Sequence, residues 1–353
     1  MLRKLIASAV AMITMSSAFS QDSSEHPALS INGSADVYYK YDLAKTKANN
    51  YTSFTNSHNS FELGMATVKL DYKTSKVEMV ADLGFGKRAQ DFSYNDAGIL
   101  QAVKQLYLSY SPADWLKLTA GSWATHVGYE LVDANLNRNY SMSYMFTNGP
   151  FFHTGVKAEL SMHGNGLMIG VANPTDFKYV PDGVVNKKFL IAQYSYTKSE
   201  NFKAFVNYVG GENIDTSKSK QLDLVLTTKI SSKFSLGANG TVTNVKSYMG
   251  NKKYDENKKW WGSALYVNFD PTSVFGLTLR EEYFSDKSGL KIPGLYLNGN
   301  IFASTLSANF RVDNFIFIPE FRIDHSNKSI FTKKDGTGTT SAANVLLAAV
   351  YQF

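Results

Sequence analysis

The sequence predicts an all-β protein, a transmembrane antiparallel β-barrel of about 16 strands with an inward-folded third loop. Three observations lead to this prediction. The chain starts with an export signal, long stretches alternate apolar and polar residues with a period of two, and short turns alternate with long polar loops. This combination is typical of bacterial outer-membrane barrels.

Residues 1–20 have the three parts of a secretory signal peptide. Arg3 and Lys4 form the charged start, residues 5–15 (LIASAVAMITM) form the apolar core, and small residues precede a cleavage site before Gln21. The apolar core is too short to cross a bilayer as a helix. The chain has no cysteine, so neither a lipid anchor on cysteine nor a disulfide is available. We therefore expect a signal peptide at 1–20 and an outer-membrane β-barrel at 21–353.

The composition restricts the class further. Hydrophobic residues make up 44% of the chain, yet no run of 18 apolar residues after the signal forms a transmembrane helix. Residues 21–353 contain 34 basic and 30 acidic residues, and this net charge of +4 does not indicate a nucleic-acid partner. No cofactor is indicated either. The apolar side chains must therefore be buried in another way, and the strand pattern predicts how.

The first strand-like stretch after the signal is the clearest. In residues 29–41 (LSINGSADVYYKY), apolar or small side chains at odd positions alternate with more polar ones at even positions. Because successive strand side chains point to opposite faces, one face meets lipid and the other lines water. The alternation recurs near 77–85, 153–162, 202–208, 221–227, 261–269, 315–324 and 344–353. It is blurred between Phe61 and Tyr72, where we expect a β-bulge to switch the faces.

The connections alternate in length and give the number of strands. Tight turns are expected near 73–75, 111–114, 163–166, 198–201, 231–233, 270–272 and 313–314. Long polar loops are expected near 42–58, 87–99, 127–150, 173–187, 211–219, 247–259, 285–299 and 326–341. Eight long loops imply eight hairpins and hence about 16 strands. A soluble β-sandwich also alternates, but its strands are shorter and its polar face points outward.

Aromatic residues near the expected strand ends also favour a membrane barrel, where they form girdles at the two interfaces. They are Tyr39, Tyr41, Tyr72, Tyr110, Tyr208, Tyr283, Tyr351 and Phe353. A final phenylalanine after alternating apolar residues is similar to the terminal strand of bacterial outer-membrane proteins.

The candidate functional element is the connection between the strand-like runs at 115–126 and 151–162. Compact proteins rarely keep about two dozen irregular residues in one loop without a role for them. The connection is the third long loop, and in this respect the chain is similar to general porins, whose third loop folds into the lumen and sets the pore width. The residues expected to form the constriction are Tyr129, Glu130, Asp133, Arg138, Tyr140 and Tyr144.

The facing pore wall is expected to carry charges of both signs. The candidates are Lys157, Glu159, Arg280, Glu282, Glu320, Arg322 and Asp324. Rings of one charge select ions by sign, so a mixed wall predicts weak selectivity. An alternative is that the third loop folds outward as an exposed cap.

The resemblance to one family is carried by residues 105–177. Three stretches carry it: LYLSYSPADWLKLTAG, HVGYELVDANLNRNYSMSYMFTNGPFFHTGVKA and GLMIGVANPTDF. They resemble the OmpL-like family of outer-membrane β-barrel porins, found largely in Bacteroidetes. The resemblance implies a membrane barrel and a pore, but no defined solute and no catalytic residues.

Three other motifs do not indicate a functional site. Residues 84–89 fit GxGxxA, but a dinucleotide site needs a following helix and residues 90–98 are turn-like. His126 and His153 bracket the third loop, but two nitrogens without carboxylate partners make a poor metal site, so a hydrogen-bonding role at the rim is favoured. No local motif marks a Ser–His hydrolase.

The sequence therefore predicts an outer-membrane porin through which small hydrophilic solutes or ions diffuse passively, and not an enzyme. The expected surroundings are outer-membrane lipid and lipopolysaccharide, and a homotrimer is left open. The alternative is a barrel with a plugged lumen that acts through its exposed loops as an adhesin or binding protein. An outer-membrane enzyme is a third reading without a motif to support it.

Overall fold

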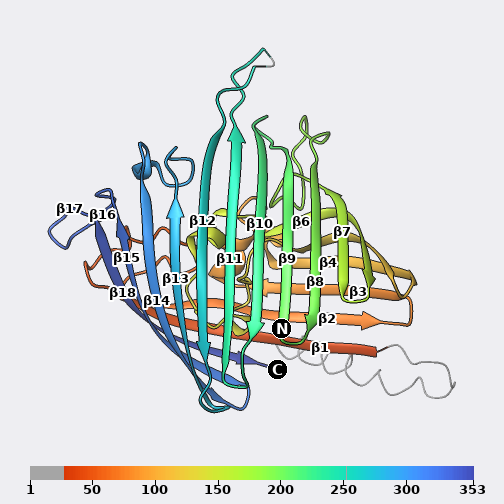
Figure 1. Ribbon diagram of the computed structural model, residues 1–353, viewed down its shortest axis with the longest axis horizontal. Coiled ribbons are helices and arrows are strands. Elements are labelled where there is room, and N and C mark those ends of the chain that lie inside the picture. Colours follow the sequence, from red (N-terminus) through yellow and green to blue (C-terminus); the bar gives the residue numbers. More distant parts are fainter. Residues whose placement is uncertain (1–27, 252) are drawn as a thin grey trace, which may run out of the picture.

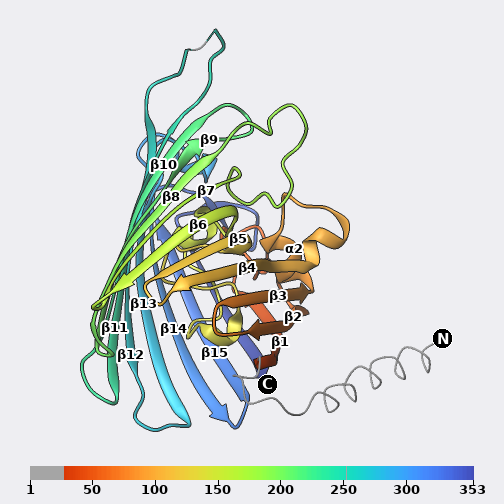
Figure 2. The ribbon, with the colours of Figure 1, turned by 90° about the vertical axis from the view of Figure 1, so that its right-hand side faces the viewer.

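The computed structural model describes residues 28–251 and 253–353, in which 16 strands close into one antiparallel barrel (Figures 1 and 2). From β1 to β15 each strand pairs with its neighbour in the sequence, and β18 completes the ring by pairing with β15 and β1. The predicted all-β barrel and its strand number are therefore confirmed. The predicted signal peptide lies outside the described residues.

The barrel strands are β1 (Ala28–Asp42), β2 (Ser60–Lys73), β3 (Val77–Phe85), β4 (Val103–Ala113), β5 (Leu116–Ala124), β6 (Phe152–Met162), β7 (Asn165–Ala172), β8 (Phe189–Ser199), β9 (Phe202–Glu212), β10 (Lys218–Lys229), β11 (Phe234–Lys246), β12 (Lys258–Phe269), β13 (Phe275–Ser285), β14 (Asn300–Val312), β15 (Phe315–Ser326) and β18 (Ser341–Gln352). A small hairpin of β16 (Phe331–Thr332) and β17 (Gly338–Thr339) lies in the last long loop. The short helices are α2 (Lys87–Phe92), η2 (Gly98–Ala102), η3 (Ala134–Leu136), α3 (Tyr144–Asn148) and η4 (Pro293–Leu295).

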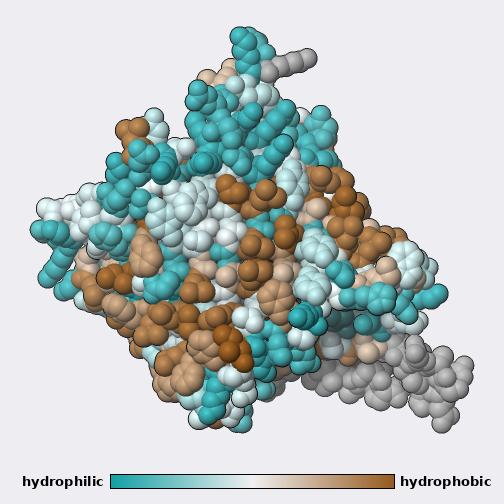
Figure 3. Space-filling model, in the orientation of Figure 1, coloured by the Kyte–Doolittle hydropathy of each residue, from teal (hydrophilic) through white to brown (hydrophobic). Residues whose placement is uncertain are grey.

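The period-two pattern appears in the barrel as burial, with polar side chains inside and apolar ones outside. In β1, Ser34, Asp36 and Lys40 are buried, whereas Val37 between them is 46% exposed. The other strands repeat this arrangement. On the outer surface of the barrel, apolar side chains cover much of the strands below the hydrophilic long loops (Figure 3). An outer apolar belt between polar ends is the surface that a bilayer covers.

The seam of the barrel joins β1 to β18. Their register runs from Ser34 opposite Gln352 to Asp42 opposite Asn344. The ladder continues to Phe353, which exchanges two backbone hydrogen bonds of 3.0 and 3.1 Å with Gly33. Closure at this seam satisfies the strand edges that would otherwise expose unpaired backbone groups to lipid.

The expected bulge lies in β2. Ala35 pairs with Ala66 but Val37 pairs with Leu63, so Gly64 and Met65 together oppose Asp36. The face of β2 switches at this point, because Leu63 and Ala66 are exposed whereas Gly64 and Met65 are both buried. The Met65 amide donates to the Asp36 carboxylate at 3.2 Å. A Cβ on Gly64 would lie 1.6 Å from that carboxylate, so the bulge requires glycine.

The tight turns and the eight long loops lie where the pattern places them. One local expectation was wrong: the start of the stretch 90–98, expected to be turn-like, is the last turn of α2. Arg88, Ala89 and Phe92 form a buried face, and this packing holds the six-residue helix in place without a side-chain cap. None of the helices in residues 28–251 and 253–353 is long and apolar enough to cross a membrane.

Candidate functional site

The candidate site is the connection between β5 and β6, residues 125–151, which we call the β5–β6 segment. Its two ends leave the wall side by side, because Ala124 pairs with Phe152. Within it, η3 is a single turn and α3 is capped by Ser143, whose hydroxyl accepts the Phe146 amide at 3.0 Å. With so little internal secondary structure, the segment depends on contacts with the rest of the chain for its shape.

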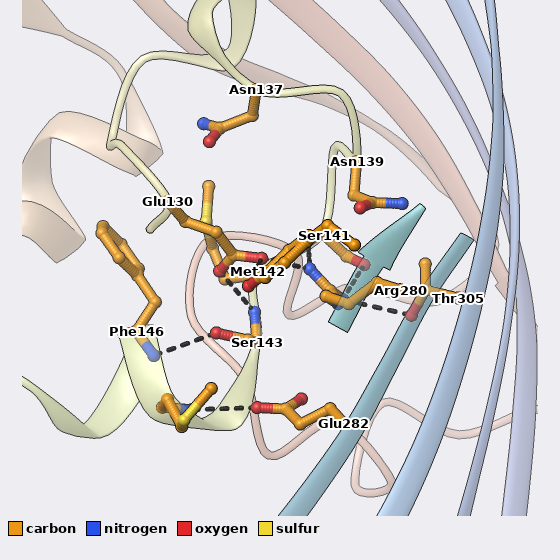
Figure 4. A network of polar contacts seen from close by, with 12 residues as sticks. Glu130, Asn137, Asn139, Ser141, Met142, Ser143, Phe146, Arg280, Glu282 and Thr305 are labelled. Carbon is orange, nitrogen blue, oxygen red and sulfur yellow. Dashed lines mark hydrogen bonds and ion pairs between the residues drawn. The ribbon is translucent and has the colours of Figure 1, made fainter. Parts of the chain in front are cut away.

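The first group of contacts joins the segment to β13. Glu130 is paired with Arg280, and both side chains are almost completely buried. Arg280 also donates to the Ser141 carbonyl at 2.7 Å and to the Thr305 hydroxyl at 3.1 Å (Figure 4). The second carboxylate oxygen of Glu130 accepts the Ser143 amide at 2.8 Å, so one ion pair organises two stretches of the segment.

Glu282, two residues further along β13, binds the start of α3. Its carboxylate accepts the Met145 amide at 3.1 Å (Figure 4). The ring of Tyr144 stacks on Phe284 at a centroid distance of 5.5 Å. Burial raises the pKa of Tyr144 well above its usual value, so its phenol stays neutral.

The second group of contacts reaches β15. Glu320 accepts the backbone amides of Tyr140 at 2.8 Å and Ser141 at 3.2 Å. Arg322 donates to the Met142 carbonyl at 2.7 Å and binds the carboxylate of Asp324 at 2.9 and 3.1 Å. Backbone groups of the segment thus find their partners in the polar rows of the wall.

The segment also meets β1 and a turn at the opposite end of the barrel. The Tyr140 hydroxyl donates to Asp36 of β1. Arg138 holds Asp270, in the β12–β13 turn, with two hydrogen bonds of 2.8 and 2.9 Å. Partial burial alone would raise the pKa of Asp270, but the guanidiniums of Arg138 and Arg311 hold it below its usual value.

Two further polar contacts lie on β4 and β10. Lys104 of β4 is buried between Asp82, at 3.1 Å, and Asp133 of the segment, at 2.5 Å. On the far side of the ring, the Gly128 amide donates to Asp223 of β10 at 3.1 Å. The segment therefore has partners on strands around most of the barrel.

Apolar packing closes the gap between the segment and the long loops. Phe54 from the β1–β2 loop, Phe92 of α2, and Phe146 and Phe151 of the segment form one buried cluster with Met65, Val132, Met142 and Phe152. Arg88 crosses this region, lies 4.5 Å from the ring centre of Tyr140, and donates to the Val132 carbonyl at 3.0 Å. Water is excluded from the cluster, since its members are almost completely buried.

The residues predicted from the sequence fall into two sets. All six of the expected constriction residues lie in the segment, and five of the seven expected wall residues touch it or its partners: Arg280, Glu282, Glu320, Arg322 and Asp324. Lys157 and Glu159 do not join this network. They pair with each other at 3.0 Å on β6, where Lys157 lies over the Trp123 ring.

A family comparison decides what kind of barrel this is. The family model described as "Putative beta-barrel porin-2, OmpL-like" matches residues 28–353. The chain belongs to this family. It is a bacterial outer-membrane protein of the porin type, which confirms the resemblance seen in residues 105–177.

Solved structures of outer-membrane proteins have the same fold as this porin. The anion-selective porin from Comamonas acidovorans aligns with a TM-score of 0.63 at 11% identity, over 93% of this chain and 100% of that one. The channel DcaP of Acinetobacter baumannii gives 0.62 at 10%, covering 95% and 99%. The trimer form of in-vitro folded OmpT from Vibrio cholerae gives 0.61 at 10%, covering 93% and 100%. No curated protein matches the sequence.

The porin also contains polar residues at the site that the sequence did not single out. Asp36, Asp82 and Lys104 belong to polar strand rows, so the alternation already carried a signal for them. Arg88 lies on the short helix α2 and Asp176 in the β7–β8 loop, where the period of the strands does not apply. Asp176 accepts the backbone amides of Phe151 at 2.7 Å and Phe152 at 3.0 Å, and burial raises its pKa to about 6.

His126 of the segment and His153 of β6 are neighbours in this porin. The rings of His126 and His153 lie 5.1 Å apart, and each ring has one hydrogen bond: His153 to the Thr125 hydroxyl at 3.2 Å and His126 to the Tyr208 carbonyl at 3.3 Å. Burial lowers the pKa of His126 to about 4, so it is neutral near pH 7. The pair thus fastens the base of the segment to the wall, in line with the hydrogen-bonding role expected from the sequence.

Proposed function

We propose that this porin passes small hydrophilic solutes by diffusion and that its β5–β6 segment folds into the lumen and narrows the passage. The observation that carries the proposal is the distribution of the segment's partners. Asp36, Asp223 and Arg280 lie on β1, β10 and β13, and each belongs to a polar row that faces the barrel interior. One connection reaches all of these rows only along a path inside the barrel.

The proposal includes the remaining features expected from the sequence. Residues 1–20 are a signal peptide, and the barrel occupies the chain from Gln21 onwards. Lipopolysaccharide surrounds the loop end, three copies associate, and no enzymatic reaction takes place. Association in threes is supported by the trimer form of the Vibrio cholerae OmpT, which shares the fold.

Single-channel recording tests the function. Purified, refolded protein in a planar bilayer should give discrete conductance steps, because water fills the space that the segment leaves free. Deleting residues 130–145 should raise the step size, since the deletion removes the inward chain but keeps both adjoining strands. Deleting residues 333–337 of the exposed last loop is the control and should leave the step unchanged.

A plugged barrel that acts through its loops is the second candidate, and one observation favours it. Large side chains such as Arg280, Tyr144 and Trp260 are fully buried inside the ring, as a filled interior requires. A correctly folded barrel without conductance steps would support this candidate and defeat the porin proposal. Heat-modifiable gel mobility is the check that the barrel has folded.

A further inference from the structure

We propose that the outer face of β10–β12 binds lipid A, the phosphorylated and acylated sugar at the base of lipopolysaccharide, through lysines that lie above an apolar groove. The inference rests on the proposed placement of the long loops at the lipopolysaccharide surface, and it adds a binding site on the barrel wall. It does not depend on conduction through the lumen. Three observations support it: the groove, the lysines above it, and a free hydroxyl inside it.

The first observation is a groove on the outer side of the barrel, on the face that points at the viewer in Figures 1 and 3. It has a volume of about 630 Å³ and is bordered by Leu222 and Leu224 of β10, Gly240 of β11 and Trp261 of β12. Gly240 forms the floor, because a Cβ at this position would meet nothing within 4 Å. A bilayer covers this face, and an unfilled gap forfeits dispersion contacts, so an acyl chain is the natural occupant.

The groove follows from the sizes of neighbouring side chains. Gly240 pairs with Leu224 on one side and with Ser263 of β12 on the other, so the smallest outward residue lies between larger ones. Two residues nearer the long loops than Ser263, the ring of Trp261 packs against Tyr283 of β13 at a centroid distance of 5.1 Å. Trp261 thus occupies the place that aromatic side chains take at a membrane surface.

The second observation is a group of lysines directly above the groove. Lys220 of β10 and Lys259 of β12 flank Asn244, which pairs with both, and Lys246 lies two residues nearer the loops on β11. All three lysines are exposed, and none forms an ion pair within residues 28–251 and 253–353. Neighbouring strands lie about 4.8 Å apart, so the Cα atoms of Lys220 and Lys259 are about 10 Å apart. Their long side chains can converge on one phosphate.

This end of the face is positively charged. Residues 212–220 and 244–259 contain seven lysines and four acidic residues, which gives a net charge of +3. Asp255 is already bound by Lys258 at 2.7 Å, so its charge does not neutralise the free lysines. Cationic side chains beside an apolar surface match an anionic headgroup that carries acyl chains. A second barrel would match the groove but not the lysines.

The third observation is a hydroxyl within the apolar belt. Ser263 is exposed on the outward row of β12, and its hydroxyl has no hydrogen-bond partner in the described part of the chain. Hydrocarbon offers this group no partner, whereas the ester and hydroxyl oxygens near the headgroup of an acylated sugar can accept its proton. The face therefore provides for three parts of the lipid: the phosphate, the ester region and the acyl chain.

Native mass spectrometry of the refolded protein in detergent tests the binding. The probes are lipid A with one phosphate, the same lipid after removal of the phosphate, and phosphatidylglycerol, an anionic phospholipid. The parent chain should retain phosphorylated lipid A about tenfold more tightly than either of the others, since only this probe combines the phosphate with the bulky acylated sugar. Equal retention of phosphatidylglycerol overturns the proposed lipid class.

Substitutions test the two halves of the site. Lys220→Gln combined with Lys259→Gln should weaken binding of phosphorylated lipid A about tenfold, because two cationic contacts are lost. Gly240→Leu fills the groove and should weaken binding of the lipid with and without its phosphate. The matched control is Lys229→Gln at the tight-turn end of β10, which should bind like the parent chain. If the double lysine variant binds as tightly as the parent, the proposal is overturned.

Cross-linking locates the lipid, and the chain suits this test because it contains no cysteine. Leu224→Cys at the groove and Ile169→Cys on the outward row of β7 are labelled with a benzophenone maleimide. The vesicles contain phosphatidylethanolamine and a minor fraction of lipid A. Illumination should attach lipid A at Leu224→Cys and phospholipid at Ile169→Cys. Equal attachment of lipid A at both positions, or attachment of a second barrel at Leu224→Cys, overturns the proposal.

Conductance of the same samples separates this inference from the pore. The double lysine variant should lose lipid binding and keep the step size of the parent chain, because the lysines lie outside the lumen. A barrel that conducts but does not retain lipid A overturns the lipid site alone. A barrel that retains lipid A at the groove without conducting supports the lipid site and defeats the porin proposal.

Discussion

Replacing Arg280 by methionine should undock the β5–β6 segment from the wall. The substitution keeps a long side chain but leaves the Glu130 carboxylate buried without its ion-pair partner. Removing one partner of a buried pair costs about 3–5 kcal/mol. The hydrogen bonds to the Ser141 carbonyl and the Thr305 hydroxyl are lost as well. Because each 1.4 kcal/mol changes an equilibrium constant about tenfold, the undocked population should rise by about two to four orders of magnitude.

Two measurements follow this change. Limited proteolysis should cut Arg280→Met within residues 125–151, where the parent chain resists cleavage, and single-channel records should show larger and noisier steps. The barrel itself should survive, since its strand ladder does not include the segment. Heat-modifiable mobility is the control for that integrity.

The double variant Arg280→Met with Glu130→Gln separates the ion pair from simple packing. A neutral glutamine no longer needs a counter-charge, so part of the protease resistance should return. If Arg280→Met is as resistant and as quiet as the parent chain, the pair does not hold the segment. If the double variant is no better than the single one, the cost does not arise from an unpaired carboxylate.

Three further predictions concern other anchors of the segment. Burial raises the pKa of Asp176 from 3.8 to about 6. The contribution of Asp176 to the stability of the segment's end is therefore complete below pH 3.8 and is lost as the pH rises through about 6. Protease resistance near Phe151 should therefore increase from pH 7 to pH 5, and Asp176→Asn should flatten the dependence; a rise with pH instead would refute the assignment. Gly64→Ala should lower the unfolding temperature, because the new Cβ displaces Asp36 and leaves the Tyr140 hydroxyl unpaired, which costs about 1–3 kcal/mol of unfolding free energy. The control is Gly240→Ala, whose Cβ meets open space, and equal effects of the two substitutions would contradict this account. Arg138→Ala should cost only about 1 kcal/mol of segment docking, because the ion pair with Asp270 is partly exposed. Limited proteolysis measures this cost, and the difference in protease resistance between Arg138→Ala and the parent chain should shrink at high salt.

The fold could be predicted from the sequence because one physical rule operates along every strand. Lipid on one side and polar groups on the other impose a period of two, which is visible in the sequence from Leu29 to Tyr41. Even the irregular stretch between Phe61 and Tyr72 was informative, since a bulge is the simplest way to change faces.

The site was predictable only in part. Strand parity places Arg280 and Glu320 inside, and loop length singles out the segment, but neither gives the pairing between them. The alternation on β6 also places Lys157 on the inner face. Lys157 nevertheless pairs with Glu159, because the segment takes its contacts from other strands. Arg88 acts from the short helix α2 and Asp176 from the β7–β8 loop, and tertiary packing sets the position of both.

The seam between β1 and β18 has a consequence for how the molecule assembles. Its partners are roughly three hundred residues apart along the chain, so this pairing is among the most costly in loop-closure entropy. Hairpins can zip up locally, but the two outermost strands find each other only after everything between them is in place. Until then the unpaired backbone groups of both edge strands can pair with other chains, so the open barrel is the state most prone to aggregation.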